Sequence, residues 1–146
     1  MKDNKLYTLA PNNSPLHNLL LQLHNIEDLI AFSNVKSAFK TTIQFIRSEP
    51  SLGKDSDFLI LSLMYSEKYY RYTTRHYQGV ISDEVFEIYE NQCIRNLLEL
   101  IQSVKEVLEE TYASVWFMLE LTVLLGQSNS RDMEIEIIIF IYSPSP

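Results

Sequence analysis

Few side chains in this sequence could do chemistry, and its histidines are the first to consider. His17 and His24 lie seven residues apart, which would place them two turns apart on one face of a helix, while His76 stands alone. Two histidines that hold one metal ion from a helix are normally four residues apart. We therefore predict no metal site here, and surface or half-buried histidines are the better interpretation.

The single cysteine is the next candidate. A reactive cysteine needs a partly exposed, electropositive setting. Cys93 instead falls in the middle of an apolar helical pattern, so we predict that it packs in the core like a small hydrophobic side chain. One thiol allows no internal disulfide and no multi-cysteine metal site, which fits a reducing cytoplasm.

The acidic residues Glu84, Glu87 and Glu90 resemble a carboxylate cluster, but no histidine accompanies them. A solvated helix face explains this spacing better than a catalytic site does. The sequence also holds no serine–histidine–acid arrangement, no phosphate-binding glycine loop, no dinucleotide fingerprint and no zinc spacing. We therefore expect no enzymatic activity and no cofactor.

Five tyrosines within thirteen residues form the least usual cluster in the chain. Tyrosine is enriched at binding hot spots, so the cluster could be an interaction surface. The favoured interpretation is that three of them, Tyr65, Tyr69 and Tyr72, pack in the core at helical spacing. Tyr70 and Tyr77 would then lie half exposed.

Helices must position these residues, because apolar side chains recur every three or four residues along most of the chain. Ser14 and Pro15 suit the start of the first helix, and Ser33 with Asn34 suits a break after it. We expect a flexible lead-in over residues 1–14 and one helical domain over 15–110. Its helices should span about residues 15–32, 34–48, 57–78 and 82–110.

The last two of these helices should form a hairpin. Gly79 stands where a left-handed residue ends a helix, and Ser82 can cap the next one. So short a connection folds two helices back on each other, which predicts an all-α fold, a small antiparallel helical bundle. Bases on the first arm should face acids on the second and help to set the pairing: Lys68, Arg71 and Arg75 against Asp83, Glu84, Glu87 and Glu90.

Residues 111–146 differ in character from the helical domain. Residues 113–125 are nearly all apolar, and residues 133–142 alternate and are rich in β-branched side chains, which predicts a lone C-terminal strand. One strand cannot form a sheet. It would pair with something outside the chain, or it would open an α/β domain of a longer protein that is truncated here.

Composition limits the possible partners. Apolar residues make up 46% of the chain and charged residues 21%, which is typical of a soluble globular protein. The net charge of −7 disfavours binding to nucleic acid and to an anionic membrane surface. Without an N-terminal apolar run of signal-peptide length, we expect a cytoplasmic protein.

Three stretches, in this order and spacing, resemble a known family. They are residues 28–39 (DLIAFSNVKSAF), 59–62 (LILS), and 78–84 (QGVISDE) continuing into 91–101 (NQCIRNLLELI). The pattern resembles the eleventh type of effector-associated domain, a small bacterial helical module, over about residues 26–103. Ser33 stands where that family usually has glycine. The matched positions that we interpret as structural are Leu29, Ala38, Leu61, Gly79, Ile81, Ser82, Asn91, Leu97 and Leu98.

The resemblance implies a death-domain-like adaptor without catalytic residues. Two such modules on different proteins associate and bring an effector enzyme to its partner in a bacterial conflict or signalling system. The expected partner is therefore a related helical domain or a second copy of this chain. The predicted interaction surface comprises Lys68, Tyr70, Arg71, Arg75, Tyr77, Glu84, Glu87 and Glu90.

Two other functions stay open on the sequence alone. The apolar region 113–142 could make the chain a membrane-active or toxic small protein, although Glu120, Glu134 and Glu136 interrupt it. An enzyme or a nucleic-acid regulator is the other alternative, and the negative charge and the absent motifs both count against it.

Overall fold

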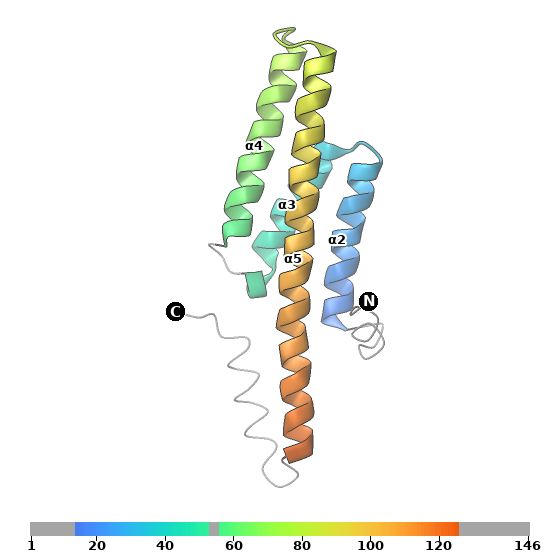
Figure 1. Cartoon of the computed structure of the whole chain (residues 1–146), viewed down its shortest axis with the longest axis vertical. Coiled ribbons are helices and arrows are strands. Elements are labelled where there is room, and N and C mark those ends of the chain that lie inside the picture. Colours follow the sequence, from blue (N-terminus) through green and yellow to red (C-terminus); the bar gives the residue numbers. More distant parts are fainter. Residues whose placement is uncertain (1–13, 53–55, 126–146) are drawn as a thin grey trace.

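The chain is all-α over residues 14–52 and 56–125, which are the residues that this computed structural model describes (Figure 1). Four helices and one short 3-10 turn follow one another: α2 at Pro15–Ala31, α3 at Val35–Ser48, η1 at Pro50–Leu52, α4 at Asp57–Tyr77 and α5 at Asp83–Leu125. The predicted all-α class is confirmed for this part of the chain. The predicted strand at 133–142 and all but the last residue of the predicted lead-in lie outside the described residues.

Serine side chains cap the N-termini of three of the helices. The Ser14 hydroxyl accepts a hydrogen bond from the backbone N–H of His17 at 3.2 Å, with Pro15 at the first helical position. Ser56 and Ser82 make the corresponding contacts with backbone N–H groups at the starts of α4 and α5, each at 3.3 Å. Each serine satisfies a backbone donor that the helix itself leaves unpaired.

Two helices end in the same left-handed motif. At the end of α4, Gly79 has a φ of 71°, and the N–H of Val80 reaches back to the carbonyl of Arg75 at 2.9 Å. At the end of α2, Ser33 has a φ of 61°, and the N–H of Asn34 bonds to the carbonyl of Leu29 at 2.8 Å. Both arrangements are Schellman motifs. The break predicted at Ser33 is confirmed, but it is a C-terminal cap, and the Asn34 side chain makes no capping bond.

Ser33→Gly is expected to raise the free energy of unfolding by about 0.5–1 kcal/mol. Glycine adopts a positive φ without the steric cost that a side chain brings, and this gain exceeds the added flexibility of the unfolded chain. Ser103→Gly, within the regular part of α5, should instead lower it by about 0.5–1 kcal/mol. Thermal unfolding followed by circular dichroism measures both, and a destabilised Ser33→Gly variant would contradict the assigned cap.

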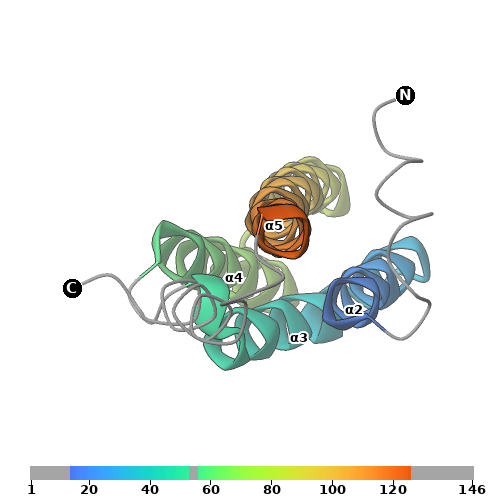
Figure 2. The same ribbon diagram turned by 90° about the horizontal axis from the view of Figure 1, so that it is seen from below.

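The core lies where α5 meets the other helices. Helices α2, α3 and α4 follow one another in a curved row, and α5 lies along the inside of that row (Figure 2). Each helix turns one apolar face inward, as the spacing of its hydrophobic residues requires. The largest fully buried apolar side chains are Phe39, Leu23, Ile26, Ile46, Leu97, Ile101, Leu108, Val35 and Val104.

Helix α5 is much longer than predicted. It has 43 residues and therefore a length of roughly 65 Å. The predicted end near residue 110 is wrong, because no glycine or proline occurs between residues 83 and 125 to stop the helix. The apolar segment 113–125 is thus the last part of α5, which extends beyond the other helices (Figure 1). Even so, no helix within the described ranges combines the length and apolar character needed to cross a bilayer.

Candidate functional site

Stacked aromatic rings join the two arms of the α4–α5 hairpin near its turn. The ring of Tyr72 stacks on that of Tyr89 with centroids 3.9 Å apart, and the ring of His76 stacks on that of Phe86 at 4.3 Å. In addition, His76 Nε2 lies 2.6 Å from Asp83 Oδ1. Together these contacts fix the position of the hairpin tip beyond the ends of α2 and α3, where it projects from the bundle (Figure 1).

The tyrosine cluster divides into core and surface as predicted. Tyr69 is buried and lies 5.5 Å, between ring centroids, from Phe39 of α3, while Tyr65 and Tyr72 pack partly buried against the core. Tyr70 and Tyr77 are exposed, and Tyr77, at 92% exposure, is almost fully in solvent. Only these last two tyrosines are therefore available to a partner.

Cys93 is a core cysteine, as predicted. It is 2% exposed and belongs to the same apolar cluster as Leu97. Burial raises the pKa of its thiol, nearby Lys68 lowers it, and Glu90 raises it further. Because a thiolate is the reactive form, a cysteine that is buried and kept protonated does not suit nucleophilic chemistry.

The predicted pairing of Lys68, Arg71 and Arg75 with the acids of the second arm is wrong, although one of those acids, Asp83, does pair across the arms, with His76. Arg71 binds Glu67 of its own helix at 2.7 Å, and the ion pair that crosses between the arms in the described residues is the one from His76 to Asp83. Over residues 14–52 and 56–125, no ion pair joins Lys68, Arg71 or Arg75 to the three facing glutamates. Glu67 lies one turn before Arg71 on the same helix, at a spacing where opposite charges are neighbours.

Two stripes of opposite charge therefore remain on the hairpin. The basic stripe is Lys68, Arg71 and Arg75, which recur at steps of three and four and are all exposed on α4. The acidic stripe is Glu84, Glu87 and Glu90 on α5, of which the first two are exposed and the third is half-buried. Arg71 is paired with Glu67. The other five of these six residues have no ion-pair partner within the described residues.

Apolar side chains are exposed at the tip of the same hairpin. Tyr77, Val80 and Ile88 each expose more than half of their surface, and Val85 exposes 37%. Neighbouring apolar side chains in solvent, with charged residues around them, are typical of protein interaction sites. The tip thus combines hydrophobic residues with the basic and the acidic stripe.

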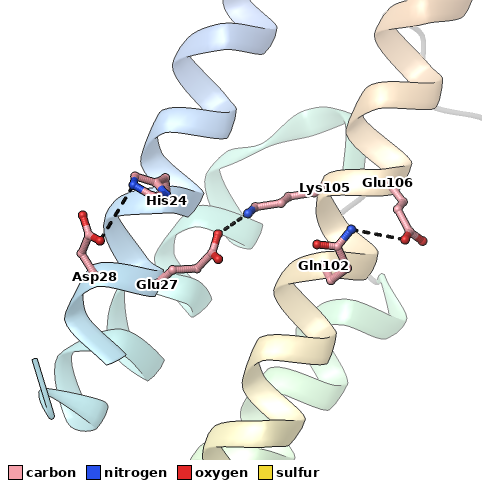
Figure 3. A network of polar contacts seen from close by, with 6 residues as sticks. All are labelled: His24, Glu27, Asp28, Gln102, Lys105 and Glu106. Atoms are coloured by element: carbon pink, nitrogen blue, oxygen red, sulfur yellow. Dashed lines mark hydrogen bonds and ion pairs between the residues drawn. The ribbon is translucent and has the colours of Figure 1, made fainter. Parts of the chain in front are cut away.

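A second polar site lies between α2 and α5 (Figure 3). There Lys105 of α5 forms an ion pair with Glu27 of α2, and His24 approaches Asp28 at 3.9 Å. A shallow pocket of about 240 Å³ beside them is lined by His17, Leu20, Leu21, His24 and Lys105. No group of three or more potential metal ligands gathers in the described part of the chain. Because Glu27 already neutralises Lys105, this pocket offers a ligand little charge, and the hairpin is the better candidate.

The residues matched by the family resemblance take mostly structural positions. Ala38 and Leu97 are fully buried, Leu29 and Leu61 pack against the core, and Ile81 is half-buried. Gly79 and Ser82 form the two caps described above, whereas Asn91 and Leu98 are exposed. Comparison of this chain with protein-family models, with curated proteins and with solved structures finds no match.

Proposed function

We propose that this small antiparallel helical bundle is a cytoplasmic protein–protein interaction adaptor, and that its α4–α5 hairpin binds a second domain of the same kind. The second domain belongs to another copy of this chain or to a partner protein. As the family resemblance implies, such association would couple an effector to its partner in a bacterial conflict or signalling system. The observation that carries the proposal is the pair of charged stripes, which form no ion pair with each other within the described residues.

The basic stripe of one copy is complementary in charge to the acidic stripe of another copy. If two hairpins meet across a two-fold axis, the basic stripe of each faces the acidic stripe of the other, so every favourable contact occurs twice. Complementary charges of this kind set the orientation of a complex and the rate of its formation. The exposed Tyr77, Val80 and Ile88 add apolar area, and Tyr77 has the side chain of a typical hot spot.

One backbone feature supports the resemblance independently of the hairpin. The family usually has glycine at the position of Ser33, and Ser33 has a φ of 61°, a conformation that favours glycine. A positive φ is uncommon for other residue types. The left-handed backbone at Ser33 is thus compatible with the glycine that the family has there, as it is at many helix C-termini.

Reversing one stripe is expected to weaken self-association about tenfold or more, since like charges then face each other across the interface. The two variants are Lys68→Glu with Arg75→Glu, and Glu84→Lys with Glu87→Lys. Sedimentation velocity over a range of protein concentrations measures the dissociation constant for each variant. Mixing the two variants should restore association, because the reversed stripes are complementary to each other.

The matched control is Lys40→Glu with Arg47→Glu. Both of these bases are exposed on α3, outside the two stripes, and the change in net charge equals that of the reversed basic stripe. The control should associate as tightly as the unchanged chain. The proposal fails if the control loses association to the same extent, or if the unchanged chain is monomeric throughout and binds no related domain.

A further inference from the structure

The last part of α5 carries apolar side chains that no described element covers. Leu108 is the last buried apolar residue of α5, and Tyr112 is the last that packs against the core. Beyond them the helix continues for 13 residues, past the ends of α2, α3 and α4 (Figure 1). Phe117 is 62% exposed there and Leu124 is 80% exposed.

The exposed apolar surface extends over more than half of this part of the helix, while Thr122 on the remaining side is buried. Three consecutive residues, 116–118, are exposed and apolar, and so are the three residues 123–125, one heptad later. Consecutive residues of an α-helix point about 100° apart, so each trio spreads over more than half of the circumference. A helix that is apolar on most sides is normally buried. In water, the exposed apolar surface of residues 113–125 is therefore expected to be covered by another segment or molecule.

We propose that residues 133–142 of the same chain are this cover and pack against residues 113–125 of α5. Glu134 and Glu136 are the only polar residues in 133–142. Burial of the remaining apolar side chains would therefore be as favourable for this segment as for the end of α5. The seven residues 126–132 join the two, and seven residues extend to roughly 23 Å, which is enough to reverse the chain direction.

The short connection favours this occupant over the alternatives. A segment tethered by a few residues is present at an effective concentration of about millimolar, far above the concentration of a second copy in dilute solution. A lipid surface rich in anionic headgroups would repel a chain with a net charge of −7. This inference does not rest on the proposed adaptor function, since it concerns the other end of α5.

Trp116 is the only tryptophan of the chain, so its fluorescence reports on this surface. In the full-length variant Ile137→Asp with Ile139→Asp, we expect Trp116 emission to shift to longer wavelength and acrylamide quenching to increase. Ile60→Asp with Met64→Asp, at two exposed apolar positions of α4, is the matched control and should change neither. Emission of the unchanged chain should not vary on dilution or on addition of anionic vesicles.

A second measurement avoids any disturbance of the apolar residues. Ser143→Cys can be labelled with bimane, which tryptophan quenches on contact, while the native Cys93 is buried. Strong quenching that Trp116→Phe removes is the expected result. The inference is overturned if bimane is not quenched and the aspartate variant leaves Trp116 emission unchanged. It is overturned equally if quenching disappears on dilution, which identifies a second copy, or if Trp116 becomes shielded only with vesicles, which identifies lipid.

Discussion

Phe39→Ala is expected to lower the free energy of unfolding by about 3–5 kcal/mol. The Phe39 side chain is 0% exposed, and its ring lies against that of Tyr69, so it joins α3 to α4 at the centre of the core. Removing the ring leaves a cavity that close-packed neighbours fill only in part. Urea denaturation followed by far-UV circular dichroism measures the change.

Phe32→Ala provides the control for Phe39→Ala, because it removes the same ring from a side chain that is 83% exposed. We expect a change within about 0.5 kcal/mol, as for most surface substitutions. Equal losses in the two variants would mean that the core lies elsewhere.

Leu97→Ala is expected to cost about 2–5 kcal/mol, since Leu97 is 0% exposed and lies on the face of α5 that packs in the core. For a domain of this size the melting temperature should fall by at least about 8 °C. Its neighbour Leu98 is 39% exposed, so Leu98→Ala gives the same chemical change about 100° around the helix, on a side that faces solvent. A larger loss for Leu98→Ala than for Leu97→Ala would show that the assigned face is wrong.

Much of the fold was predictable because its signals are local. Ser14, Gly79 and Ser82 act on backbone groups within a few residues, so their capping roles follow from short stretches of sequence. The buried face of α5 likewise follows from helical periodicity, and Cys93, Leu97, Leu100, Val104 and Leu108 are all buried.

The end of α5 was missed for a physical reason that the sequence does contain. The composition changes near residue 111 from amphipathic to apolar, and such a change resembles a boundary between elements. A helix, however, ends where its backbone hydrogen bonding is interrupted, and nothing before Gly126 interrupts it. Backbone signals should therefore outweigh a change in composition when helix ends are predicted.

The tertiary pairs of the candidate sites could not be predicted. Lys105 and Glu27 are 78 residues apart and meet only because α2 packs beside α5. His76 meets Asp83 across a turn whose geometry depends on the left-handed Gly79. Arg71 pairs with Glu67 of its own helix, and this pairing helps to decide which charged residues stay unpaired. It depends on the reach of the arginine side chain as well as on charge.

The uninterrupted backbone of α5 makes it a stiff strut that links the hairpin tip to Leu125. Helices without proline or glycine curve only gently, so the strut resists bending. Two copies that dock through their tips would hold the far ends of their struts at a set spacing and angle. In such a pair, the geometry of docking at one end would set the separation and angle at the other end without any rearrangement of the core.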